Sequence, residues 1–153
     1  MDNLTNLIEQ HPLLKDISDV HLAELAECAN YQTFNAGHLI FREGAEADKC
    51  FLIQEGTVSL EIFNLERGNI LVQTLGPGDV LGWSWLVSPY KWRFDAKALK
   101  TVKAIVLDGT LLRKKCSEDP SFGYELLKKF VLVLEQRLHA TRLQLLEVYG
   151  MQK

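Results

Sequence analysis

The chain has 153 residues, of which 47% are hydrophobic and 24% charged, and its formal net charge is −3. This length suits one domain with a hydrophobic core and is too short for two. The acidic balance argues against a nucleic-acid-binding surface over the whole protein, and no apolar run is long enough to span a membrane. The start, MDNLTN, lacks the basic region of a secretory signal, so we expect a cytoplasmic protein.

The first 30 residues are predicted to form helices. A weak helical pattern covers residues 3–9, and a stronger one covers residues 19–29. Ser18 suits the N-cap of the second helix, and Asp19 suits its first turn. One face of this helix is apolar, with the spacing of a buried stripe: Leu22, Leu25, Ala26 and Ala29.

Residues 31–108 consist of short runs of Val, Ile, Leu and Phe separated by glycines. This pattern is typical of many short strands without long helices between them, and it favours an antiparallel roll or barrel. Residues 57–63 alternate, with Val58, Leu60 and Ile62 on one face, and residues 70–75 can pair with them as a hairpin.

Residues 76–86 (GPGDVLGWSWL), called the cassette below, are the candidate ligand site. Glycine followed by a short helical turn exposes unpaired backbone N–H groups, which favour phosphate or carboxylate. Trp83 and Trp85, however, stand where a small polar rim would be expected. The cassette therefore predicts an anion site with an unusual aromatic character.

Residues 109–150 are predicted to form a short helix and then a long one. Asp119 and Pro120 suit the N-cap and the first position of the long helix, and Gly150 suits its end. Steps of four and three residues produce an apolar seam typical of a coiled coil: Leu127, Val131, Leu134, Leu138, Thr141, Leu145 and Val148. We therefore expect a homodimer through residues 120–149.

A second apolar stripe, Leu126, Phe130 and Val133, indicates that the long helix also packs on its own domain. Two points leave the dimer open. The whole apolar surface of the helix could pack on the chain's own roll instead. A parallel dimer would also bring Arg137 near Arg142 of the second copy, a like-charge contact, so its register is undecided.

Three motifs occur in order along the chain: residues 36–44 (AGHLIFREG), 50–58 (CFLIQEGTV) and 77–82 (PGDVLG). Together they resemble the cyclic-nucleotide-binding domain of the catabolite-activator and anaerobic-regulator superfamily, over nearly the whole chain. The resemblance implies a mainly β fold with flanking helices: N-terminal helices, an eight-stranded antiparallel β-roll and a long dimerisation helix.

We accordingly expect a single domain over residues 1–153, divided into N-terminal helices (1–30), the β-roll (31–108) and the C-terminal helices (109–150). The superfamily commonly carries a DNA-binding winged helix-turn-helix after the long helix. This chain stops at Lys153, so the C-terminal DNA-binding domain and direct DNA binding are not expected.

In the superfamily, the roll binds the phosphate of a cyclic nucleotide through a Gly-Glu pair that opens a short helix and through an arginine on the next strand. Here Gly82 is kept, but the glutamate position holds Trp83, and the arginine position holds Trp92 or, with a shift of one residue, Arg93. Strand alternation favours Trp92 as the inward residue. Phe94, Ala96 and Ala98 would then also point inward, and Lys91, Arg93, Asp95 and Lys97 outward.

The resemblance implies a ligand similar to cyclic AMP. Without a charge-assisted arginine contact, its binding would be weaker by roughly 1.5–3 kcal/mol. The candidate ligand-contacting residues are Leu81, Gly82, Trp83, Ser84, Trp85, Leu86, Trp92 and Arg93. Two hypotheses follow. Either Trp83, Trp85, Tyr90 and Trp92 form an aromatic pocket with Lys91 and Arg93 at its mouth, or these aromatic rings fill the cavity and no ligand binds.

Catalysis is not expected. The histidines are His11, His21, His38 and His139, and only His38 lies in the predicted roll, so no metal site is expected. The cysteines, Cys28, Cys50 and Cys116, form no Cys-x-x-Cys pair and are expected to be buried, reduced thiols. The sequence favours a non-catalytic ligand-sensing module that signals to a partner protein, and the alternative is a dimeric interaction module with a filled pocket.

Overall fold

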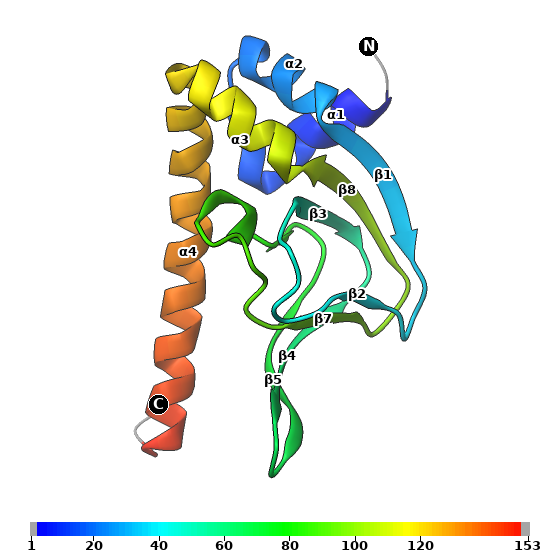
Figure 1. Cartoon of the computed structure of the whole chain (residues 1–153), viewed down its shortest axis with the longest axis vertical. Helices are drawn as coiled ribbons and strands as arrows, with labels where there is room; N and C mark the ends of the chain where they lie inside the picture. Colours follow the sequence, from blue (N-terminus) through cyan, green and yellow to red (C-terminus); the bar gives the residue numbers. More distant parts are fainter. Residues whose placement is uncertain (1–2, 151–153) are drawn as a thin grey trace.

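The computed structural model describes residues 3–150 (Figure 1). Helices lie at both ends of the chain: α1 (Asn3–Gln10), a 3-10 turn η1 (Pro12–Leu14), α2 (Asp19–Glu27), α3 (Gly109–Glu118) and α4 (Pro120–Val148). Between them lie β1 (Ala29–Phe34), β2 (Leu39–Phe41), β3 (Lys49–Glu55), β4 (Val58–Asn64), β5 (Gly68–Leu75), β6 (Val80–Leu81), a 3-10 turn η2 (Ser84–Leu86), β7 (Asp95–Ala98) and β8 (Val102–Asp108).

The eight strands form two four-stranded sheets, with the orders β1-β8-β3-β6 and β2-β7-β4-β5. All neighbouring strands are antiparallel. The inward side chains of both sheets form one buried cluster inside the roll, which includes Phe41, Phe51, Leu60, Trp92 and Val106. The predicted fold class, an eight-stranded antiparallel roll with flanking helices, is confirmed.

Helix α2 begins as the sequence predicts but ends earlier. The Ser18 hydroxyl accepts the N–H of His21, as an N-cap does, and Leu22 and Leu25 are buried. Ala29, which we expected on the same helical face, instead begins β1 and pairs with Leu107 of β8. The helical periodicity of the sequence would include this residue, but its pairing with β8 places it in the sheet.

The β4–β5 hairpin projects from the end of the roll that lies opposite the N-terminal helices (Figure 1). Of the three residues expected on one face of β4, Val58 and Leu60 are buried and Ile62 is 39% exposed. The pairing with β5 shifts between Leu60 and Glu61, as at a β-bulge, and the strand beyond this point leaves the core.

Local capping explains where α3 and α4 begin. The Asp108 carboxylate accepts the N–H of Leu111, and the Asp119 carboxylate accepts the N–H of Phe122. Proline is tolerated at position 120 because the first helical N–H has no partner within the helix. Helix α4 then extends along one side of the molecule, past both the helical end and the roll (Figure 1).

The two apolar stripes of α4 have different surroundings. Leu126 and Phe130 are buried in a second core cluster, which lies between the helices and the roll, and Val133 packs against it. The seam residues Leu127, Val131, Leu134, Leu138, Leu145 and Val148 are all exposed. The alternative in which the whole apolar surface packs on the chain's own roll is therefore wrong for this stripe.

Candidate functional site

The cassette begins with a tight turn and ends with η2. The N–H of Gly76 donates to the Asp79 carboxylate (2.8 Å), and the N–H of Gly78 donates to the Ile53 carbonyl (2.9 Å), which holds the turn against β3. Gly82 has a φ of +95°, and a Cβ atom there would lie 2.7 Å from the Trp92 ring. Both the backbone conformation and the close approach require glycine at position 82.

Trp92 lies inside the roll, where strand alternation places it. Only 4% of this residue is exposed, and its ring stacks on Phe41 at 3.7 Å between centroids with 8° between the planes. Ala96 and Ala98 are also fully buried, whereas Arg93 is exposed. The indole of Trp92 therefore takes up the space beside Gly82 in the roll.

The four aromatic residues do not form one pocket, so that hypothesis is wrong. Trp85 is fully buried in the core between the helices and the roll, edge-on to Phe130 at 5.5 Å, whereas Trp92 belongs to the roll interior. Trp83 is half-buried and lies beside α4, and Tyr90 lies beside α3. Trp83 and Trp85 are only two residues apart, at the start of the tight turn η2. The Trp83 ring nevertheless lies beside Arg137, and the Trp85 ring lies beside Phe130.

Three of the predicted site residues meet at a surface cleft outside the roll. Trp83, Ser84 and Arg93 line it together with Val87 and Lys91, and its volume is about 180 Å³. Leu81 and Trp85 are buried elsewhere, and Leu86 lines a separate hollow beside Tyr90 and Arg113. The cleft joins two cations, a hydroxyl and an aromatic ring, a combination that suits an anionic ligand with a flat group.

Two arginines that were not predicted to lie at the cassette attach it to α3 and α4. The Arg137 guanidinium donates to the Val80 carbonyl and lies 4.8 Å from the centroid of the Trp83 ring. The Arg113 guanidinium donates to the Trp85 carbonyl and lies 4.0 Å from the centroid of the Tyr90 ring.

Burial lowers the pKa of Arg137 to about 10, and the nearby Asp79 carboxylate only partly opposes this. An arginine among the apolar residues of the long helix is the sequence signal that could have drawn attention to it. Its partner carbonyl is 57 residues away in the chain, so no local pattern reveals the contact.

The three cysteine thiols are free, and the pKa of each is raised. Burial raises the pKa of Cys28 to about 11 and that of Cys50 to about 12, and it also raises the pKa of Cys116. A catalytic thiol needs the opposite shift, because the thiolate is the reactive form.

The similarity to solved structures extends over most of the chain. The structure of a protein from Geobacter metallireducens GS-15, described as a cyclic nucleotide-binding protein, superposes with a TM-score of 0.81 at 26% identity, covering 91% of this chain and all of that one. The regulatory domain of Toxoplasma gondii PKA, crystallised with cAMP, has a TM-score of 0.63 at 16% identity, covering 72% of this chain and 42% of that one. This second likeness shows the fold alone.

The sequence comparisons point the same way. The chain is 23% identical over 138 residues to a CRP-like cAMP-activated global transcriptional regulator of Mycobacterium tuberculosis (strain ATCC 25618 / H37Rv), which covers 90% of this chain. The chain spans 60% of the length of that relative. None of the described helices is both long and apolar enough to cross a membrane. The model of the cyclic nucleotide-binding domain matches residues 31–119, more than half of the sequence, and the chain therefore belongs to this domain family.

Proposed function

We propose that the protein is a non-catalytic regulatory module that senses an anionic ligand at the outer cleft of the cassette and signals through its helices to a partner protein. The observation that carries this proposal is the cleft itself. It gathers Lys91, Arg93 and Ser84 around the Trp83 ring, on a segment that contacts α4 directly.

The chemistry of the cleft suits a nucleotide phosphate. Lys91 and Arg93 are exposed cations from the segment before β7, and the Ser84 hydroxyl can donate to a phosphate oxygen. The Trp83 ring supplies a flat face for a base. Because Trp92 fills the interior of the roll beside Gly82, the ligand in this proposal lies on the outer side of the cassette.

Arg137 provides the route from the cleft to α4. Its guanidinium contacts the Trp83 ring and the Val80 carbonyl at the same time, so a ligand that moves Trp83 changes the surroundings of α4. Such a ligand acts by shifting an existing equilibrium of helix positions, in proportion to its preference for one of them.

Calorimetry with cyclic AMP, cyclic GMP and cyclic dinucleotides at millimolar concentration tests the ligand. We expect at least one of them to bind. The double variant Lys91→Ala, Arg93→Ala should bind it at least about tenfold more weakly than the wild type, since each cation contributes a charge-assisted contact. Lys97→Ala is the matched control, because Lys97 is an exposed cation of β7 that does not line the cleft. Absence of binding by every compound would overturn the ligand proposal.

A second candidate function is a dimeric interaction module that binds no nucleotide. The stacking of Trp92 on Phe41, inside the roll and against Gly82, favours it. In this case no compound in the calorimetric series binds, and Trp92 acts only as part of the core.

We also propose that α4 forms a homodimer. A groove of about 600 Å³ beside α4 is lined by Leu127, Val131 and Leu132 together with charged residues such as Lys128. The exposed apolar residues continue beyond it to Val148. Such a long run of exposed apolar residues is typical of a protein interface. The contact of Arg137 with Val80 and Trp83 also turns this side chain toward its own roll, which weakens the objection that it would meet Arg142 of a second copy.

The free cysteines support a reducing compartment such as the cytoplasm.

A further inference from the structure

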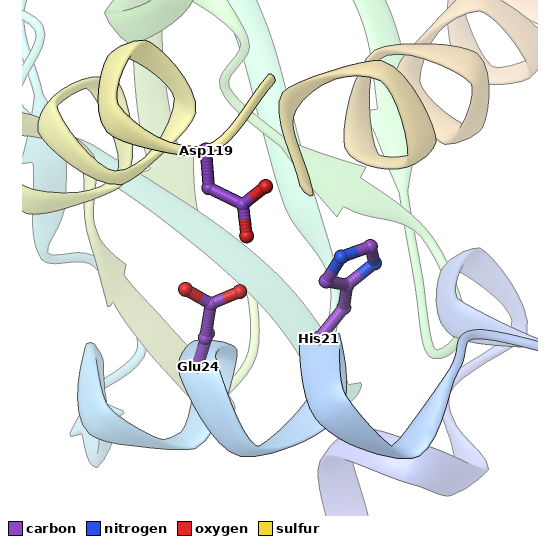
Figure 2. A group of neighbouring side chains, drawn as sticks. All are labelled: His21, Glu24 and Asp119. Carbon is purple, nitrogen blue, oxygen red and sulfur yellow. The ribbon is translucent and has the colours of Figure 1, made fainter. Parts of the chain in front are cut away.

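Three side chains with metal-ligating atoms converge where α2 meets the start of α4. His21 and Glu24 come from one face of α2, three residues apart, and Asp119 is the residue between α3 and α4. One ligand atom from each residue lies within 4.8 Å of the others. Figure 2 shows the imidazole and both carboxylates turned toward a common space between the helices.

The imidazole of His21 is held by its other edge. Its Nδ1 atom is hydrogen-bonded to the Glu125 carboxylate, which also accepts the N–H and the hydroxyl of Ser18 at 3.3 Å each. In Figure 2 the remaining ring nitrogen faces the two carboxylates. A histidine whose second nitrogen is held by a carboxylate is the usual arrangement of a metal ligand, because the carboxylate fixes the tautomer and the ring orientation.

The carboxylates have unused bonding capacity. Glu24 Oε2 is buried and has no hydrogen-bond partner among the described residues. Asp119 uses Oδ1 to accept the N–H of Phe122, which leaves Oδ2. Within residues 3–150 neither the Glu24 nor the Asp119 carboxylate forms an ion pair. The neighbouring Lys115 is paired with Glu27 at 2.7 Å. A buried carboxylate oxygen close to a second carboxylate is costly unless a cation joins them.

We propose that His21 Nε2, Glu24 and Asp119 bind one divalent transition-metal ion, with zinc as the best match, and that Glu125 orients the histidine. Zinc takes imidazole nitrogen and carboxylate oxygen at about 2.0–2.2 Å, so tetrahedral ligands lie roughly 3.4 Å apart, and small rotamer changes close the present spacing. Three protein ligands leave a fourth position for water. The ion would connect α2 to the first turn of α4, the helix that carries the exposed seam.

This site differs from the expectation that the isolated histidines of the sequence hold no metal. His21 and Glu24 are separated from Asp119 by nearly one hundred residues, and only the packing of α4 on α2 brings them together. Cys116 is the one thiol whose pKa is raised in part by both carboxylates, so it is the alternative ligand that the test must exclude.

The test uses the full chain without an affinity tag, freed of metal, and titrated with zinc by calorimetry and by thermal unfolding. We expect one zinc ion per chain and a higher melting temperature. Glu24→Gln and Asp119→Asn should each weaken binding by about tenfold or more, and asparagine still caps α4. Glu27→Gln, on the same helix but outside the cluster, is the matched control and should bind zinc as the wild type does.

Two results would overturn the site. The first is a wild-type protein that neither binds zinc nor gains thermal stability. The second is binding that persists in Glu24→Gln and Asp119→Asn but disappears in Cys116→Ser, which would place the ion on the thiol. Circular dichroism of each metal-free variant confirms that a loss of binding is not a loss of folding.

Discussion

The roll interior and the outer side of α4 differ in how they treat their apolar side chains. Beside Gly82, where the family resemblance implies a ligand, the Trp92 ring is buried and stacked on Phe41. Along α4, where a partner would bind, the apolar residues of the seam are 40–79% exposed. The space for a ligand in the roll is filled, and the surface for a second protein is open. Of these two regions, only the outer side of α4 therefore keeps an exposed apolar surface.

The largest expected effect tests the packed roll. Trp92→Ala removes a buried indole and should lower the free energy of unfolding by about 3–5 kcal/mol, because a cavity remains next to Phe41. Leu138→Ala, on the exposed side of α4, should change the monomer's stability by only about 0.5 kcal/mol. Urea denaturation at low protein concentration measures both. A loss below about 1 kcal/mol for Trp92→Ala would mean that the roll interior is loosely packed. The roll interior and the exposed side of α4 would then not differ in packing as described.

The second effect concerns the open side of α4. Leu138→Glu places a charge in the middle of the proposed seam, and a symmetric dimer contains the change twice. We expect dimer affinity to fall by about 3 kcal/mol or more, roughly a hundredfold, and the mass in solution to halve. Leu65→Glu is the control, since Leu65 is 92% exposed in the β4–β5 turn and is not part of the seam. Light scattering that shows a monomeric wild type would contradict the homodimer.

A smaller effect tests how tightly the Trp92 ring packs against Gly82. Gly82→Ala and Gly37→Ala both place alanine at a positive φ, at +95° and +90°, but only the Cβ atom at position 82 meets the Trp92 ring. We expect Gly82→Ala to cost about 1–3 kcal/mol more than Gly37→Ala, measured as free energy of unfolding. Equal costs would show that the Trp92 ring moves freely, which a packed interior does not allow.

The smallest effect concerns His11, a polar residue in the buried layer at the helical end. Burial lowers the pKa of His11 below 6.5, and the nearby Asp79 only partly opposes the shift. The unfolded chain therefore binds this proton more readily than the folded one, so stability should fall as the pH drops below about 6.5. His11→Asn keeps an acceptor for the N–H of Leu13 but does not titrate. Its stability should depend less on pH between 7 and 5, and an unchanged pH dependence would contradict the assignment.

Short-range patterns carried much of the fold. The N-caps Ser18 and Asp119 and the inward direction of Trp92 follow from hydrogen bonds and alternation within a few residues. Where a local pattern met a competing long-range contact, it failed. Ala29 continues a helical stripe in the sequence but pairs with Leu107 in the sheet.

The sequence by itself determined the order of elements, the glycine-rich turn of the cassette and the apolar seam of α4, because periodicity and turn chemistry are properties of neighbouring residues. Only the tertiary structure decided which groups meet. It placed Trp85 and Trp92 in different core clusters, joined Arg137 to Trp83, and brought Asp119 to His21. These contacts form only when segments distant in the sequence pack together. The free energy that stabilises them depends on the whole fold, so no short stretch of the sequence predicts them.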